Sequence, residues 1–171
     1  MARLHLIIGP VGAGKSTYAR KLCREQNAAR LVLDEWMATL YGDDPRPNHG
    51  RLQWYMERAE RCLEQIWCVA QDLMDIGTPV VLEVGLIQRA RRQDFYARVD
   101  NKAYDLSVYV LDADRDVRRA RVERRNRDKG ETFSMEVPPD MFELASDLWE
   151  PPADDECAER EVHFIRQTHS E

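Results

Sequence analysis

The sequence contains no long hydrophobic run and no cysteine pair of the kind that binds metals. Apolar stretches such as residues 4–8 and 80–84 are about five residues long, whereas a membrane-spanning helix needs roughly 20. The 4 cysteines form no CxxC pair and have no histidine at zinc-finger spacing. The first residues lead into an apolar segment without a signal-peptide pattern. The sequence therefore argues against a membrane helix and a zinc finger, and we expect a cytoplasmic location.

The chain also lacks an excess of positive charge. Its 25 Lys and Arg residues against 31 Asp and Glu residues give a formal net charge of −6 and an isoelectric point near 5.3. Such a balance disfavours nonspecific attraction to nucleic acid or to an anionic membrane. With 171 residues, 43% of them hydrophobic, the chain can bury a continuous core without disulfides. It contains no internal repeat and no long linker, so we expect one domain over residues 1–171.

Short apolar segments alternate with segments of helical periodicity. A helix is expected over residues 15–26, and a long one over 52–73, where apolar residues recur at helical spacing. Segments that are apolar throughout are typical of a parallel sheet covered on both faces by helices. We therefore predict an α/β fold. The expected strands cover residues 4–8, 30–33, 79–84, 106–111 and 162–165.

A glycine-rich loop lies between the first expected strand and the first expected helix. The segment Gly9-Pro10-Val11-Gly12-Ala13-Gly14-Lys15-Ser16 matches the phosphate-binding pattern GxxxxGKS. In such loops the backbone N–H groups surround nucleotide phosphates, and the glycines allow the close approach. We expect Lys15 to contact the β- and γ-phosphates, Ser16 to bind Mg²⁺ and Thr17 to lie near the α-phosphate. The loop alone does not decide whether the γ-phosphate is transferred, hydrolysed or only sensed.

Two acidic residues stand where expected strands end. Asp34 follows the second strand, at the edge of the sheet where ligands of open α/β folds bind. There it can accept the proton of an acceptor hydroxyl, or it can cap the helix that begins near Glu35. Glu83 ends the third strand, where it can hold Mg²⁺ directly or through water, or can bind substrate.

Basic residues are concentrated in residues 115–129, which carry eight basic residues against three acidic ones. An arginine brought in by a closing segment can stabilise the charge that develops during phosphoryl transfer. Arg121 and Arg125 share a helix face, so we expect them to reach the site from a lid over about 115–140. Solvated ion pairs are expected for Arg115, Arg119 and Arg127. Further candidates for contacts with anions follow the third strand at Arg89, Arg91 and Arg92.

Together these features resemble the P-loop kinases of the polynucleotide-kinase and zeta-toxin group, often described as AAA-type ATP-binding proteins. The likeness spans nearly the whole chain and rests on the glycine-rich loop, Asp34, Glu83 and the pattern Arg121-x-x-x-Arg125. It implies a three-layer α/β/α sandwich with a five-stranded parallel sheet in the order 2-3-1-4-5. It also implies ATP and Mg²⁺, with Asp34 as the catalytic base, Lys15 and Arg125 as charge stabilisers, and Arg121 as a lid contact near the nucleotide.

The resemblance leaves the acceptor open. Members of the group often carry Asp at the position of Glu83, and many have an arginine shortly after the base, where this chain has Trp36-Met37-Ala38. The loop after Asp34 is acidic and aromatic, whereas a polynucleotide kinase needs a basic channel. We therefore favour an ATP-dependent kinase acting on a hydroxyl of a small molecule such as a sugar, a nucleotide sugar or an antibiotic-like compound. The alternatives are a polynucleotide 5′-hydroxyl kinase, a toxin of the zeta type and an ATP-binding regulatory module without an acceptor; the sequence identifies no protein partner.

Overall fold

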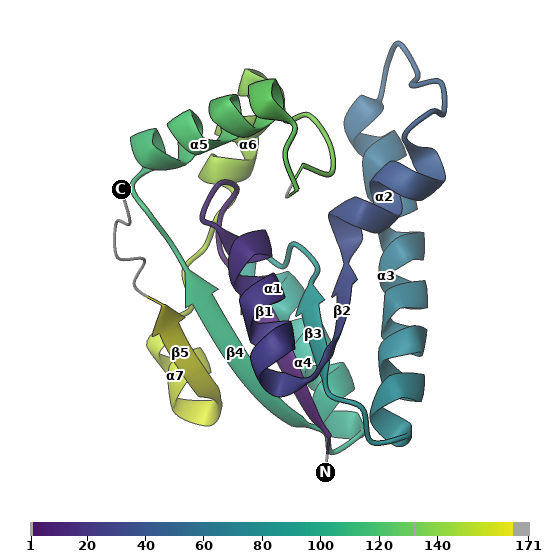
Figure 1. The fold of residues 1–171 in the computed structure, drawn as a ribbon, viewed down its shortest axis with the longest axis vertical. Helices are drawn as coiled ribbons and strands as arrows, with labels where there is room; N and C mark the ends of the chain where they lie inside the picture. The colour runs from purple at the N-terminus through teal and green to yellow at the C-terminus, as the bar shows by residue number, and fades with distance from the viewer. Residues whose placement is uncertain (1, 132, 166–171) are drawn as a thin grey trace.

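Five parallel strands form one sheet in the computed structural model, which describes residues 2–131 and 133–165 (Figure 1). Their order across the sheet is β2-β3-β1-β4-β5, and every pair of neighbours runs parallel. The predicted fold class and strand order are therefore confirmed. The strands are β1 (Arg3–Ile8), β2 (Ala29–Val32), β3 (Val80–Glu83), β4 (Asp105–Leu111) and β5 (Glu161–Ile165).

Helices cover both faces of this sheet. Alternate residues of β1 point to opposite faces: Ile7 packs on the side of α1, and Leu6 packs on the side of α3 and α4. The central strands β1 and β3 are buried on both faces and mainly apolar, as the sequence pattern predicted, whereas the edge strand β5 is partly exposed. The helices of the described chain are α1 (Lys15–Gln26), α2 (Leu33–Tyr41), α3 (Arg51–Asp75), α4 (Arg89–Asn101), α5 (Arg115–Asp128), α6 (Pro139–Asp147) and α7 (Asp154–Glu159).

The long helix α3 was predicted over 52–73 from its apolar spacing. Its buried positions recur every three or four residues from Ala59 to Met74, and the chain turns at Gly77, whose φ is +84°. With 25 residues α3 is about 37 Å long, whereas its neighbours β2 and β3 have four residues each. The N-terminal turns of α3 therefore extend beyond the carboxyl edge of the sheet (Figure 1).

The boundary between β2 and α2 differs from the prediction. Leu33 was expected to end the second strand but begins α2, because Leu33 and Met37 lie on one helix face and both pack in the core. The N-cap of this helix is Val32, and Asp34 is the second helical residue. The alternative role of Asp34 as an N-cap is therefore wrong.

Two projections stand above the carboxyl edge of the sheet, with the glycine-rich loop between them (Figure 1). One, here called the arm, consists of α2, the loop over 42–50 and the N-terminal half of α3. Arg58 stabilises the arm, because its guanidinium lies over the Trp54 ring at 4.0 Å and over the Tyr41 ring at 5.4 Å. The other projection, here called the lid, consists of α5, α6 and the described residues between them, close to the predicted 115–140. Within the described ranges, no helix is long and apolar enough to cross a membrane.

Candidate active site

The glycine-rich loop turns sharply between β1 and α1. Gly12 and Gly14 have φ values of +80° and +88°, in the left-handed region that glycine adopts without strain. A Cβ atom on Gly12 would lie 2.7 Å from the backbone oxygen of Arg118 in the lid. No described side chain caps the N-terminus of α1, so its first N–H groups and its dipole are available to an anion.

The loop residues divide into those that face the cleft above the sheet and those that support them. Gly9, Pro10 and Ala13 are buried beneath the loop. The carbonyl of Pro10 accepts hydrogen bonds from Nζ of Lys15 at 2.9 Å and from the backbone N–H of Ala13 at 3.2 Å. These bonds hold the lysine against its own loop. The residues that line the cleft are Val11, Gly12, Gly14, Lys15, Ser16 and Thr17.

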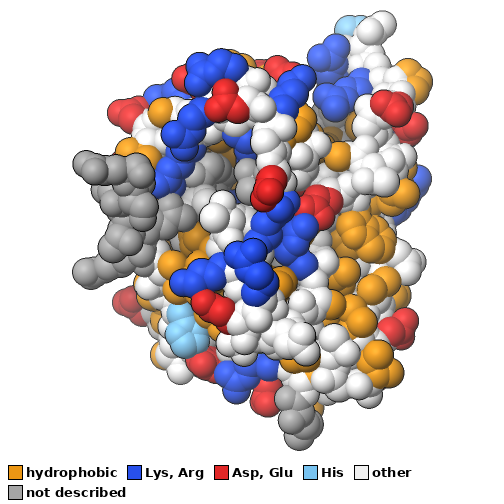
Figure 2. All heavy atoms as spheres, in the orientation of Figure 1, with side chains coloured by type: hydrophobic (Ala, Val, Ile, Leu, Met, Phe, Trp, Pro, Cys, Tyr) orange, Lys and Arg blue, Asp and Glu red, His pale blue; other side chains and the backbone are white. Residues whose placement is uncertain are grey.

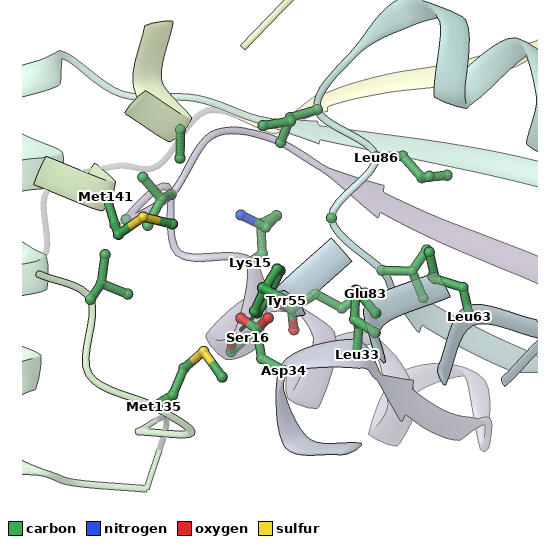
Figure 3. A pocket seen from close by; sticks show the side chains of 18 of the residues that line it. Lys15, Ser16, Leu33, Asp34, Tyr55, Leu63, Glu83, Leu86, Met135 and Met141 are labelled. Carbon is green, nitrogen blue, oxygen red and sulfur yellow. Dashed lines mark hydrogen bonds between the residues drawn. The ribbon is translucent and has the colours of Figure 1, made fainter. Parts of the chain in front are cut away.

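Lys15, Ser16 and Glu83 form a charged cluster at the carboxyl ends of β1 and β3 (Figure 3). Ser16 Oγ donates a 2.9 Å hydrogen bond to Oε1 of Glu83, whereas the buried Oε2 of Glu83 has no hydrogen-bond partner among the described residues. Burial raises the pKa of the Glu83 carboxyl, although the charge of Lys15 and the bond from Ser16 oppose this. Burial likewise lowers the pKa of Lys15, against the attraction of Glu83 and Asp34. Ligand groups of the opposite charge would relieve both effects.

This cluster fits Mg²⁺, which prefers oxygen ligands and usually takes only one or two from protein. The Ser16 hydroxyl and the unpaired Oε2 of Glu83 are oxygens of this kind. In the part of the chain that the structure describes, no group of three or more His, Cys, Asp and Glu could hold a metal. A cation bound here would therefore depend on nucleotide phosphates and water for its other ligands. Metal binding by Ser16 and Glu83 stays a prediction.

Asp34 faces the same cleft from the first turn of α2 (Figure 3). Its carboxylate is exposed and lies close enough to Lys15 to affect the pKa of that lysine. Tyr55 of α3 lies beside it: burial raises the pKa of the Tyr55 hydroxyl well above its ordinary value, and the charge of Asp34 adds to the rise. Helical spacing placed Tyr55 on the face of α3 that packs on the sheet. It lines the cleft instead because α3 extends past the sheet edge.

Arg121 and Arg125 both line the cleft from α5, as their spacing predicted. Arg125 is near enough to Lys15 to lower the pKa of that lysine, and its buried Nε has no hydrogen-bond partner in the described structure. A buried guanidinium donor without a partner is suited to an anionic ligand. The catalytic roles of both arginines stay predictions.

Arg118, which the sequence did not single out, joins the lid to the glycine-rich loop. Its buried guanidinium donates hydrogen bonds to the carbonyl oxygens of Ala113 at 2.9 Å and Val11 at 3.0 Å, and to Oγ of Ser146 at 3.0 Å. The Arg118 side chain therefore connects α5 both to α6 and to the glycine-rich loop. No sequence signal could have shown this, because Val11 is 107 residues away.

The other arginines that the sequence singled out bind protein carboxylates. Arg115 and Arg119 form the predicted surface ion pairs, both of them with Glu143. The expectation that Arg92 contacts an anionic ligand is wrong: it is fully buried and pairs with Glu156 through two hydrogen bonds of 2.8 and 2.9 Å. The remaining pairs are Arg89 with Asp155, Arg91 with Glu60 and Arg127 with Asp128.

One cleft of about 1690 Å³ lies between the arm and the lid. The residues predicted for the site that line it include Lys15, Ser16, Asp34, Glu83, Arg121 and Arg125. Pockets for one small molecule usually enclose roughly 300–1,000 Å³, so this cleft has room for a nucleotide and a second substrate. Basic side chains border it over α1, along the lid and near the tip of the arm (Figure 2). Those that line it are Lys21, Arg24, Arg46, Arg51, Arg121, Arg124 and Arg125, with Arg91 and Arg98 on α4.

The sequence profile of one protein family, AAA_33, described as an AAA domain, matches residues 4–152. The chain belongs to this AAA-domain family. The match includes the loop, Asp34, Glu83 and the lid arginines. A search among curated proteins gives no match.

Solved structures share the fold of this AAA domain. A chain of the Pnkp1/Rnl/Hen1 RNA repair complex is 22% identical with a TM-score of 0.66 over 86% of this chain and 43% of that chain, so the AAA domain spans less than half of that relative. A gluconokinase from Sinorhizobium meliloti is 16% identical with a TM-score of 0.55 over 98% and 84%. Kti12 from Chaetomium thermophilum, solved with ADP-AlF3, is 14% identical with a TM-score of 0.70 over 95% and 88%. The AAA domain thus has the three-layer fold of P-loop kinases, as predicted.

The contact between Gly12 and the lid predicts a position-specific effect of alanine. Gly12→Ala would place Cβ against Arg118, whereas Gly77→Ala, with a similar φ of +84°, would meet nothing within 4 Å. Both variants carry the backbone strain of a left-handed residue, but only Gly12→Ala also places an atom against the lid. We expect Gly12→Ala to weaken ATP binding roughly 10-fold and Gly77→Ala to leave it unchanged. Titration calorimetry checks this, and equal affinities would show that the loop does not need the close approach.

Proposed function

We propose that this AAA domain is an ATP-dependent phosphotransferase that moves the γ-phosphate to a hydroxyl group of a small molecule, with Asp34 as the base. The observation that carries the proposal is that Lys15, Glu83, Asp34 and Arg125 line one cleft. These residues come from four separate elements. The charges of Glu83, Asp34 and Arg125 all affect the pKa of Lys15. Such a cluster is suited to a reaction that concentrates negative charge.

On the nucleotide side, the loop supplies positioning and charge. The N–H groups at the start of α1 bind phosphate oxygens, and Lys15 exchanges its bond to the Pro10 carbonyl for a phosphate. Arg125 approaches from the lid with its unpaired Nε, and Arg121 contacts the nucleotide from one turn earlier on the same face. Ser16 and Glu83 would hold Mg²⁺, which would neutralise charge on the phosphates. Closure of the lid over the cleft would exclude water from the site.

On the acceptor side, Asp34 orients a hydroxyl and accepts its proton as the acceptor oxygen attacks. Its carboxylate is exposed to the cleft and needs no rearrangement to receive a substrate. Tyr55 and Leu33 flank it (Figure 3) and limit the directions from which an acceptor can approach.

Replacement of Asp34 tests this role. Asp34→Asn keeps the size of the side chain but cannot take the proton, so we expect transfer to fall roughly 100-fold while ATP binds normally. The effect is at the low end for a general base because little proton transfer is needed in a loose phosphoryl-transfer transition state. The measurement is transfer of label from [γ-³²P]ATP to alcohols in a small-molecule cell extract, with ATP affinity measured in parallel.

The matched control is Asp43→Asn, which removes an exposed carboxylate from the loop of the arm. Thermal unfolding of each variant shows whether it is folded. If Asp34→Asn transfers label as fast as the parent protein, Asp34 is not the base. ATP binding without any labelled product in the parent protein would instead favour a regulatory module.

A second candidate, a polynucleotide 5′-hydroxyl kinase, is favoured by the basic border of the cleft. Arg46 and Arg51 line it on the arm, close to the loop whose acidic residues argued against a basic channel. A single strand could place its phosphates along these residues and along Lys21 and Arg24. Labelling of a 5′-hydroxyl oligonucleotide that declines steeply between 50 and 200 mM salt would support this candidate, and absence of labelling at low salt would exclude it.

A further inference from the structure

Four large apolar side chains are exposed in the cleft, in the part between α3 and the lid, here called its acceptor half. Leu52 and Met56 on α3 are 52% and 42% exposed, and Met141 and Leu148 in the lid region are 37% and 39% exposed. All four line the cleft. Large apolar side chains left in water and gathered in one concave place mark a binding surface.

Two walls and a floor make up this half of the cleft. Tyr55 and Leu63 of α3 form one wall, Met135 and Met141 of the lid form the other, and Leu86 lies at the base (Figure 3). Asp34 and Lys15 line the same cleft and lie between these two groups of side chains in the view of Figure 3. A molecule bound between the walls would therefore present one end to Asp34.

Two acidic side chains nearby are already paired with arginines. Glu60 and Glu64 of α3 line the cleft, but they form ion pairs with Arg91 at 3.3 Å and Arg98 at 2.5 Å on α4. A polyol needs hydrogen-bond partners for each of its hydroxyls, since an unpaired buried hydroxyl is costly. The walls named above also offer apolar contact, and Asp34 lies in the same cleft.

The side-chain types favour a ring over a flexible chain. Met56, Met135 and Met141 are three of the 6 methionines of the protein. Methionine sulfur makes favourable contacts with aromatic rings and adapts to irregular shapes. Tyr55 and Trp54 add aromatic surfaces that pair with a ring edge or face.

We infer that the acceptor is an alcohol whose body is apolar and contains an aromatic ring, held between α3 and the lid with its hydroxyl at Asp34. This inference rests on the proposed function. The acceptor oxygen forms a bond to the γ-phosphorus, its proton passes to Asp34, and the bond from the γ-phosphorus to the β–γ bridging oxygen breaks. ADP leaves with that electron pair, and the product is a phosphate monoester.

The test compares ring-bearing alcohols with polyols in two measurements. 2-Phenylethanol, whose ring is apolar, and thymidine, whose ring carries polar groups, represent the first class, and D-gluconate and glycerol represent the second. Binding is measured by calorimetry with the nucleotide site filled by the non-hydrolysable analogue AMP-PNP, so that thymidine cannot occupy it. Transfer is measured with [γ-³²P]ATP. We expect the ring-bearing alcohols to bind and react at least about 10-fold better than the polyols.

Two variants and a control test whether the alcohol binds between the two walls. Met56→Ser and Met141→Ser remove one apolar contact from each wall, and each should raise the KM for 2-phenylethanol roughly 10-fold without changing the KM for ATP. Ile76→Ser removes an apolar side chain that is 78% exposed and does not line the cleft, and it should change neither constant.

The possible results separate this inference from the proposed function. Transfer to D-gluconate as fast as to the ring-bearing alcohols would overturn the inference and leave the kinase intact. Ring-selective binding that both methionine variants weaken, without any transfer, would uphold the inference and contradict the kinase. Binding without ring selectivity, or labelling of a 5′-hydroxyl oligonucleotide but not of thymidine, would overturn the inference.

Discussion

Replacement of Lys15 by methionine is expected to reduce phosphoryl transfer about 10³-fold while making the ligand-free protein harder to unfold by heat. The loss of transfer follows from the position of the Lys15 ammonium group, which lies at the phosphate loop, where the charges of Glu83, Asp34 and Arg125 act on it. Methionine keeps a similar length and fills the same space, so the loop should retain its shape. The Pro10 carbonyl would still accept a hydrogen bond from the N–H of Ala13.

The gain in stability follows from the lowered pKa of Lys15, which burial causes. Above the ordinary value of 10.5, the lysine is neutral in the folded and in the unfolded chain, and the charge has no effect. As the pH falls below 10.5, the unfolded chain takes up a proton that the folded protein accepts less readily. The folded protein is thereby destabilised at neutral pH, and Lys15→Met removes that destabilisation. We expect a Tm roughly 3 °C higher at pH 7.

Differential scanning fluorimetry at pH 7 and pH 10, with and without ATP, checks both parts. The difference in Tm between Lys15→Met and the parent protein should shrink at pH 10, and ATP should raise the Tm of the parent only. Lys102→Met, which replaces an exposed lysine at the C-terminal end of α4, is the control and should show neither effect. If Lys15→Met instead melts at a lower temperature than the parent at pH 7, the cost of burying the lysine charge is already fully offset by the attraction of Glu83 and Asp34.

Local signals predicted where the residues of the glycine-rich loop lie. The glycine-rich loop, the strand before it and the helix after it are continuous in sequence, so the positions of Lys15 and Ser16 follow from the pattern and from strand direction. Asp34 and Glu83 were identified because parallel strands end at one edge of the sheet, which brings residues that follow different strands together. The lid arginines were identified by their spacing on one helix.

The acceptor half could not be predicted in the same way. Tyr55 has the same helical spacing as the core residues of α3, and only the length of α3 relative to β2 and β3 decides that it lines a cleft. Met135 and Met141 lie in the lid, and their neighbours across the cleft depend on the tertiary arrangement. Arg92 is one of three arginines within four residues, and its burial depends on Glu156, 64 positions later. Such pairings have no local signature.

Separation of Arg92 from Glu156 is expected to destabilise the protein by roughly 3–5 kcal/mol, because it leaves a buried charge without its partner. Both side chains are fully buried, and Nη1 of Arg92 also donates hydrogen bonds to the carbonyls of Leu86 at 3.4 Å and Ile87 at 3.2 Å. Arg92→Met or Glu156→Leu alone should lower the Tm by about 10 °C. The double variant should recover much of this loss, since an apolar pair needs no charge compensation. Urea denaturation of all four proteins gives the coupling energy.

Acid sensitivity provides a second readout of the same pair. Burial would raise the pKa of Glu156, but the hydrogen bonds from Arg92 and from the backbone of Ala153 hold it below its ordinary value of 4.5. The stabilisation is therefore complete above pH 4.5 and is lost as the pH falls through the lower folded value. The advantage of the parent protein over the double variant should narrow in that range. Arg91→Met, which breaks the exposed pair with Glu60, should cost less than about 1 kcal/mol at any pH. Arg92 also holds the loop that follows β3, through its bonds to the carbonyls of Leu86 and Ile87. Loss of Arg92 should therefore raise the KM for the acceptor without changing the KM for ATP. Loss of a structural ion pair remote from the cleft would not change the KM for the acceptor.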